Sequence, residues 1–406
     1  MKILIVSPYL PHPRSGHGTG DVMHGLLRHI SRRHEITLIS FCDKRELALA
    51  ADLKELPIRF HAVPRRKGVQ ENVWSNLSLV ATRLLQFCRS LVLWQPYYMG
   101  KYYHPRMARL IKRLTAGSSY DIVQLDMVQM GQYFRYAGGC KRILYAYEVA
   151  FRPAYRRYRS AASILARSLS FIRWCQCALF ERRMAGKFDR ILCVTDQDKT
   201  LLERLTSSRR MSYLPLGADV SGQPPPYASR ERESLVFVGS FSHRPNREAV
   251  LWLVGEIFPL VLNKFPGATL SVIGSNPPDE LKELAARTPQ VRILGFVDDV
   301  AGYLRTSAVF IAPLRSGGGV KVKILHAMGQ GIPVVTTKVG IEGITPEGAL
   351  VGNTAGRLAD NICALFGDRD RAAEVGRKGW EAMRAWNSWE SVTLRLEGIY
   401  EQVLAS

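Results

Sequence analysis

The chain has 406 residues, of which 47% are hydrophobic and 22% charged, so it can bury the cores of two or three domains and is not intrinsically disordered. Its formal net charge of +21 attracts anionic partners such as lipid surfaces, phosphorylated substrates or nucleic acids. No nucleic-acid reader motif is present, and no apolar run reaches the roughly 18 residues of a membrane span, which argues against a nucleic-acid partner and an integral membrane protein.

The first half alternates apolar strands with helical stretches. Strands are predicted at residues 2–7, 35–40, 58–63, 122–125, 143–147 and 191–194, and a helix at residues 21–31. This alternation is typical of parallel strands joined by crossover helices, which places the chain in the α/β class. The start lacks a signal peptide's long apolar core, so we expect a cytoplasmic protein.

A glycine-rich loop follows the first strand and contains Gly16, Gly18 and Thr19. Its spacing matches neither a dinucleotide fingerprint nor a P-loop. Ligands of open parallel sheets bind at the carboxyl ends of the strands, so these three residues are candidate ligand contacts. A surface loop that binds nothing is the alternative.

Two further sites of interest lie at strand ends. Glu148 follows the strand at 143–147, where its carboxylate is placed to orient a hydroxyl group, or else to pair with Arg152. Thr195 and Asp198 have the spacing of a helix capping box, which we favour over a metal-binding acidic pair.

Two basic, aromatic stretches cover residues 83–113 and 152–187. In the second, arginines are interleaved with apolar residues such as Ile164, Leu169 and Phe171. This pattern is typical of a helix on an anionic membrane surface, so attachment to the inner membrane face is one hypothesis. The alternative is an ordinary helix that buries its apolar face.

The seven cysteines are scattered and odd in number, without the paired spacing of a zinc site. This pattern indicates reduced thiols, and no metal or cofactor is expected.

The second half begins after a proline-containing stretch at residues 221–233. Its most informative segment, residues 311–328, combines a strand end, three successive glycines, two lysines and a helix predicted from Val320 to about Gly329. Glycines let a ligand approach the backbone, and a helix N-terminus offers N–H groups and a positive dipole. The segment therefore predicts a diphosphate site, although a strand, turn and helix also occur without any ligand.

The order of these segments resembles GT-B glycosyltransferases of the retaining family 4. The resemblance is carried by residues 317–343, together with 235–246, 267–274, 291–299 and 388–390. It implies two Rossmann-like domains facing a cleft. The implied boundaries are an acceptor-side domain at 1–217, a linker at 218–234, a nucleotide-sugar donor domain at 235–386 and a C-terminal helix at 387–406 that returns to the first domain.

The resemblance also implies an activity: transfer of a sugar from a nucleotide diphosphate to a glycan or lipid-linked acceptor, in cell-envelope or exopolysaccharide synthesis. Lys321 and Lys323 would stabilise the leaving diphosphate without a metal, and Glu148 would serve the acceptor. The implied donor-binding residues are Gly239, Ser240, Phe296, Val297, Gly317, Gly318, Gly319, Val320 and His326. Gly16, Gly18 and Thr19 would form an acceptor or phosphate loop.

The chain departs from the family pattern at two positions. His326 and Gly318 stand where relatives carry glutamates, and a neutral imidazole accepts one hydrogen bond where a carboxylate accepts several. Three alternatives therefore stay open: a nucleotide-sugar epimerase of the same fold, a non-catalytic homologue that binds nucleotide or lipid, and a membrane scaffold.

Overall fold

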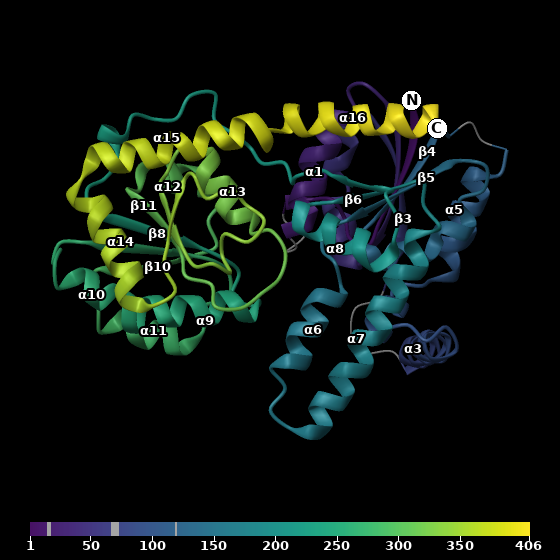
Figure 1. The fold of residues 1–406 in the computed structure, drawn as a ribbon, viewed down its shortest axis with the longest axis horizontal. Coiled ribbons are helices and arrows are strands. Elements are labelled where there is room, and N and C mark those ends of the chain that lie inside the picture. Colours follow the sequence, from purple (N-terminus) through teal and green to yellow (C-terminus); the bar gives the residue numbers. More distant parts are fainter. Residues whose placement is uncertain (14–17, 66–72, 118–119) are drawn as a thin grey trace. The chain divides into compact units, whose positions relative to one another are not determined.

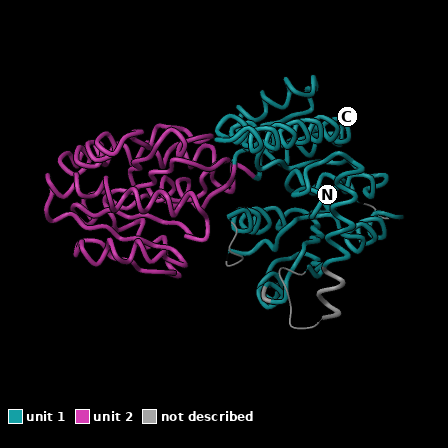
Figure 2. The backbone as a smooth tube through the Cα atoms, turned by 90° about the horizontal axis from the view of Figure 1, so that it is seen from below, with its two compact units in different colours: residues 1–215, 393–406 teal, residues 216–392 magenta. Residues whose placement is uncertain are grey.

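The computed structural model describes residues 1–13, 18–65, 73–117 and 120–406. The chain forms two compact units (Figure 2). Unit 1 contains residues 1–215 and 393–406, and unit 2 contains residues 216–392.

Unit 1 is built on a seven-stranded parallel sheet in the order β3-β2-β1-β4-β5-β6-β7. The strands are β1 (Lys2–Ser7), β2 (Glu35–Cys42), β3 (Ile58–Pro64), β4 (Ile122–Asp126), β5 (Lys141–Ala146), β6 (Arg190–Cys193) and β7 (Met211–Tyr213). The strand order reverses between β1 and β4, and ligands of open α/β sheets bind at such a switch point. The apolar strands of β1 and β4 are fully buried, as the sequence predicted.

Helices flank this sheet (Figure 1). They are α1 (Gly18–Ile30), α2 (Lys44–Leu49), α3 (Val73–Val92), α4 (Tyr97–Gly100), α5 (Pro105–Thr115), α6 (Phe151–Arg159), α7 (Ile164–Ala185), α8 (Asp196–Thr206) and the end of α16 (Trp389–Ala405). The predicted capping box is confirmed, because the Asp198 N–H donates to Thr195 Oγ1 at 3.0 Å where α8 begins.

Unit 2 repeats the arrangement with six parallel strands in the order β10-β9-β8-β11-β12-β13. The strands are β8 (Ser234–Val238), β9 (Thr269–Ile273), β10 (Val291–Gly295), β11 (Val309–Ala312), β12 (Val334–Thr336) and β13 (Ala349–Val351). The helices are α9 (Arg244–Trp252), α10 (Phe258–Leu262), α11 (Asp279–Ala286), α12 (Val300–Thr306), α13 (Val322–Gly329), α14 (Ala355–Gly367) and α15 (Arg369–Trp386). Here the switch point lies between β8 and β11.

The proline-containing stretch before β8 packs on unit 2. Arg230 is only 3% exposed, and its guanidinium donates to the carbonyl oxygens of Leu304, Ser307 and Gln330 at 2.6 to 2.9 Å. Such a buried, fully bonded arginine fixes the segment against its domain.

Among the described helices, none combines the length and the apolar content that crossing a bilayer requires. All seven cysteines lie in the described ranges and carry free thiols.

Trp389, the first residue of α16, packs against Gly217 and donates from Nε1 to Asp219 Oδ1 at 2.9 Å. A Cβ at Gly217 would overlap the indole ring. We therefore expect Gly217→Ala to lower the free energy of unfolding by about 1 to 3 kcal/mol, the usual cost of overpacking. Urea unfolding measures this.

The matched control is Gly222→Ala in the same unit, where an added Cβ has open space. Its free energy of unfolding should change by less than about 0.5 kcal/mol. Equal effects of the two substitutions would show that the contact with Trp389 does not constrain position 217.

Candidate functional site

The predicted glycine turn lies at the carboxyl end of β11, beside the switch point of unit 2. Gly317 has φ +110° and Gly319 has φ +68°, which residues with a side chain rarely adopt. Helix α13 begins at Val322 rather than at the predicted Val320, with Lys321 as the residue before the helix. The correction has a physical reason: the left-handed Gly319 keeps the backbone out of the helical conformation for longer than the glycine spacing suggests.

Two lysine side chains converge near this turn. Lys321 Nζ donates to the carbonyl oxygens of Gly319 at 2.5 Å and Gly318 at 3.4 Å. Lys323 Nζ donates to Val238 O at 2.8 Å and to Asn246 Oδ1 at 2.6 Å. The second lysine therefore joins α13 to the end of β8.

Gly239 makes room for this arrangement. A Cβ at this position would lie 2.8 Å from Lys323 Nζ and 2.8 Å from the Asn246 amide. The neighbouring Ser240 accepts at its carbonyl oxygen from Asn246 Nδ2 at 2.8 Å. Two of the predicted donor-binding residues thus adjoin the lysines, and Asn246 is a neighbour that the sequence analysis missed.

Positive charge is concentrated here. Burial, together with the charge of Lys321, lowers the pKa of Lys323 to about 7. Burial also lowers the pKa of His243, and both lysines contribute to that shift. Cations that are costly to bury together are stabilised when an anion arrives, so the site is suited to a diphosphate. His243 was not predicted, since a histidine before Arg244-Pro245 carries no recognisable signal.

The remaining predicted donor residues have different surroundings. His326 lies one turn after Lys323, and both are half-buried, whereas Ile324 and Leu325 between them are buried. This agrees with the predicted shared helix face. Phe296 and Val297 follow β10, which β9 separates from β8, and Phe296 is 66% exposed.

A second candidate site lies in unit 1, at the switch point between β1 and β4. A small pocket there is lined by Ser7, Tyr9, Thr19, Gly20, Met23, Asp126, Met127 and Tyr147. Asp126 ends β4 and is fully buried, and burial raises its pKa to about 8. At neutral pH the carboxyl group is therefore mostly protonated.

Two polar atoms of this pocket's residues are buried without a hydrogen-bond partner among the described residues: Asp126 Oδ2 and the Tyr147 hydroxyl oxygen. Unsatisfied buried polar groups are rare and call for an explanation, of which a missing ligand is one. Met127 next to them has φ +68°, an uncommon conformation of the kind found at functional sites. The sequence analysis missed Asp126, although an aspartate directly after an apolar strand was a usable signal.

The other Asp126 oxygen is held from within unit 1. Gln124 Nε2 donates to Asp126 Oδ1 at 2.9 Å, and the Tyr400 hydroxyl on α16 donates to Gln124 Oε1 at 2.6 Å. All three side chains are buried. The C-terminal helix therefore helps to orient this carboxyl group.

The predicted acceptor-side residues surround this pocket only in part. Thr19 lines it, but Gly18 and Thr19 belong to the first turn of α1, because the helix begins at Gly18 and not at the predicted Asp21. Gly16 lies outside the described residues. Glu148 is exposed and follows Tyr147, and its charge contributes to the raised pKa of Tyr9. Arg152 donates to Asp198 Oδ1 at 3.2 Å.

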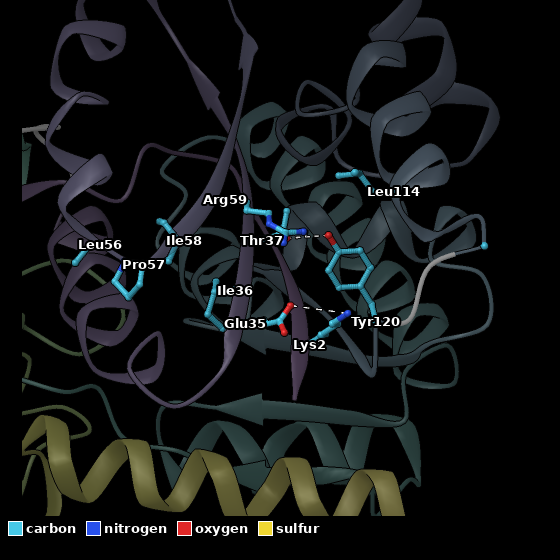
Figure 3. A pocket seen from close by; sticks show the side chains of 11 residues that line it. Lys2, Glu35, Ile36, Thr37, Leu56, Pro57, Ile58, Arg59, Leu114 and Tyr120 are labelled. Carbon is cyan, nitrogen blue, oxygen red and sulfur yellow. Dashed lines mark hydrogen bonds and ion pairs between the residues drawn. The ribbon is translucent and has the colours of Figure 1, made fainter.

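The largest pocket, about 680 Å³, lies elsewhere in unit 1, at the amino ends of β1, β2 and β3 (Figure 3). There Tyr120 donates to Thr37 Oγ1 at 2.8 Å, and Lys2 lies 3.9 Å from Glu35. Ligands of open parallel sheets bind at the opposite edge, so we assign this pocket no role.

Within the described ranges, no three His, Cys, Asp or Glu side chains gather closely enough to hold a metal ion.

Comparison with known proteins bears on both units. Residues 232–368 match the family described as glycosyl transferases group 1. The chain is similar to a GDP-mannose-dependent alpha-(1-6)-phosphatidylinositol monomannoside mannosyltransferase of Mycobacterium tuberculosis, with 27% identity over 46% of this chain and 54% of that protein. The chain thus spans about half the length of the curated relatives it matches.

Two solved structures cover nearly the whole chain. A sucrose-phosphate synthase from Thermosynechococcus elongatus has a TM-score of 0.71 at 17% identity and covers 100% of this chain and 99% of its own. Anabaena HepE in complex with UDP and glucose has a TM-score of 0.65 at 12% identity and covers 99% of this chain and 100% of its own. The chain has the GT-B fold, and the predicted resemblance to group 1 glycosyltransferases is confirmed.

Proposed function

We propose that this GT-B chain is a retaining glycosyltransferase that moves a sugar from a nucleotide diphosphate to a glycan or lipid-linked acceptor. One observation carries the proposal: Lys321 and Lys323 converge with the left-handed Gly317 and Gly319 at the switch point between β8 and β11. A compact cationic site beside open backbone fits a diphosphate better than it fits an uncharged sugar.

The transfer would follow from this electrostatic arrangement. As the bond between the sugar and the diphosphate breaks, negative charge develops on the departing phosphate oxygens. Lys323 is held by Val238 O and Asn246 Oδ1, so its charge needs little reorganisation when that negative charge appears. Preorganised charge of this kind supplies a large share of enzymatic rate enhancement, and it can do so without a metal.

The acceptor would meet unit 1 at the pocket that contains Asp126. Its protonated carboxyl group can donate a hydrogen bond from Oδ2 to a sugar or lipid-headgroup hydroxyl while Gln124 holds Oδ1. Glu148 is exposed next to this pocket and is the candidate group for orienting the attacking hydroxyl. Retention of the anomeric configuration would then require the donor phosphate to accept the proton of that hydroxyl.

The choice of donor and acceptor to test comes from the relative. The mycobacterial mannosyltransferase is GDP-mannose-dependent and acts on a phosphatidylinositol monomannoside by its name. We therefore propose a hexosyl donor, with GDP-mannose as the first candidate, and a lipid-linked acceptor in cell-envelope synthesis.

Thermal unfolding with UDP, GDP and ADP, and with their sugars, tests the donor part. One nucleotide should raise the melting temperature of unit 2, because a ligand at about 100 times its Kd stabilises the folded state by about 2.7 kcal/mol. Mass spectrometry of products should then show the sugar attached to an acceptor.

Two outcomes would overturn the proposal. A free epimerised nucleotide-sugar as the product would identify an epimerase. No stabilisation by any of the nucleotides or nucleotide-sugars would favour the non-catalytic homologue, for which His326 and Gly318 in place of glutamates are the motivating residues.

A further inference from the structure

Helices α6 and α7 form a hairpin that extends away from the sheet of unit 1 (Figure 1). Only the base of the hairpin is buried, through Cys177, Phe180, Glu181 and Ala185 on α7. The outer part, which we call the hairpin tip (residues 157–173), consists of the end of α6, the turn and the start of α7. The tip therefore makes little contact with the core of the unit.

The hairpin has its own internal packing. Trp174 stacks on Tyr158, with ring centroids 5.9 Å apart and planes 7° apart, and Phe171 and Tyr155 complete the aromatic cluster. At the base, the Glu181 carboxylate accepts hydrogen bonds from the N–H groups of Ala150 at 2.6 Å and Phe151 at 3.0 Å, where α6 begins. Such packing and capping build a defined projection rather than a loose loop.

The hairpin tip exposes large apolar side chains. Ile164 is 88% exposed, Leu165 71% and Leu169 60%. The hypothesis that this stretch buries its apolar face in an ordinary way is wrong for these residues. Clustered apolar side chains that a domain leaves in water mark an interaction surface.

The charge around these side chains is of one sign. Residues 149–180 contain six arginines and no aspartate or glutamate. Arg157, Arg159, Arg167 and Arg173 are all exposed. An apolar tip ringed by arginines complements a surface with an apolar interior and an anionic border, which describes an anionic bilayer.

A second exposed apolar set lies on the neighbouring α3, with Leu84, Leu91 and Val92 at 58 to 84% exposure. Arg183 on α7 donates to Leu93 O at 3.0 Å, which ties the end of α3 to the hairpin. A self-association through the tip is disfavoured, since two copies would bring arginines face to face.

We propose that the hairpin tip inserts Ile164, Leu165 and Leu169 into an anionic membrane while the surrounding arginines bind lipid phosphates. The inference extends the proposed function, which places the acceptor in a lipid. Vesicle binding needs no turnover, so the two can fail separately. Full-length protein lacking transfer activity through Lys323→Met should still bind vesicles.

The test is co-sedimentation of the full chain with vesicles of phosphatidylcholine alone or mixed with phosphatidylglycerol. Wild type should bind the mixed vesicles. The triple variant Ile164→Ser, Leu165→Ser, Leu169→Ser should bind them at least about tenfold more weakly, because each loses buried CH₂ groups. Replacing Arg157, Arg167 and Arg173 by glutamine should remove the preference for the anionic lipid.

The matched control is Leu394→Ser with Leu404→Ser on α16, which are 52% and 38% exposed, and it should bind as wild type does. Thermal unfolding of each variant checks folding, which changes at exposed positions should leave intact. The proposal is overturned if wild type does not bind the mixed vesicles, or if the triple variant binds them equally well. It is also overturned if sedimentation velocity shows a wild-type dimer that the triple variant loses, which would make the tip a protein interface.

Discussion

Replacing Lys323 by methionine should lower kcat/KM for sugar transfer by about 10³, a loss typical of removing one preorganised group that stabilises transition-state charge. Methionine keeps most of the volume of the side chain and removes the charge that Val238 O and Asn246 Oδ1 hold in place. Steady-state kinetics with the identified donor measure the effect. The matched control is Lys282→Met, an exposed lysine that pairs with Asp279 on α11, and its kcat/KM should stay at the wild-type value.

The same lysine should make donor binding depend on pH. Burial lowers the pKa of Lys323 to about 7, so above pH 7 the side chain of the free protein is mostly neutral. A bound diphosphate favours the charged form and raises this pKa, so binding takes up a proton. The donor Kd should therefore rise by up to about tenfold per pH unit above pH 7.

Calorimetric titrations with a nucleotide-sugar at pH 6.5 and pH 8.5 test this linkage. The diphosphate of a nucleotide-sugar has no proton to lose in that range, and buffers of different ionisation enthalpy reveal the proton uptake. Lys323→Met should bind weakly, with the same Kd at both values of pH. Equal wild-type affinities at pH 6.5 and 8.5 would show that Lys323 is already charged in the free protein, or that it does not contact the donor.

Replacing Asp126 by asparagine should make the protein more stable relative to wild type as the pH rises. Burial raises the Asp126 pKa from its usual value near 4 to about 8. Between these values the folded state holds a proton that the unfolded state has lost, so wild-type stability falls with increasing pH. Asparagine does not titrate. The difference in unfolding free energy between variant and wild type should therefore grow by up to about 4 kcal/mol from pH 5 to pH 8 and then level off.

Urea unfolding of both proteins at several pH values measures this difference. Burial raises the pKa of Glu181 to about 8 as well, and its contribution has the same sign, but it cancels because both proteins contain it. Asp298→Asn, at an exposed position after β10, should show no pH-dependent difference. A constant gap between Asp126→Asn and wild type would mean that the carboxyl group ionises normally in the folded state. Loss of transfer activity in the same variant would link Asp126 to the acceptor.

The outcome for the predicted elements follows from how local each signal is. The β1 strand at residues 2–7 was predicted to the residue, because a run of apolar residues buried on both faces leaves one arrangement in a parallel sheet. Helix starts were less well predicted. For α1 and α13 the first turns depend on glycine backbone angles, which the sequence permits but does not choose.

The sequence by itself determined the α/β class, the glycine turn and the two lysines of the donor site, because each depends on residues close together in the chain. Only the tertiary structure decided which distant residues meet: Lys323 with Asn246 across Gly239, and Tyr400 with Gln124 beside Asp126. It also decided that Ile164 and its neighbours stay in water, since the same apolar pattern fits a buried helix. Burial is a property of the packed chain, and burial is what shifts the pKa values of Lys323 and Asp126 toward neutrality.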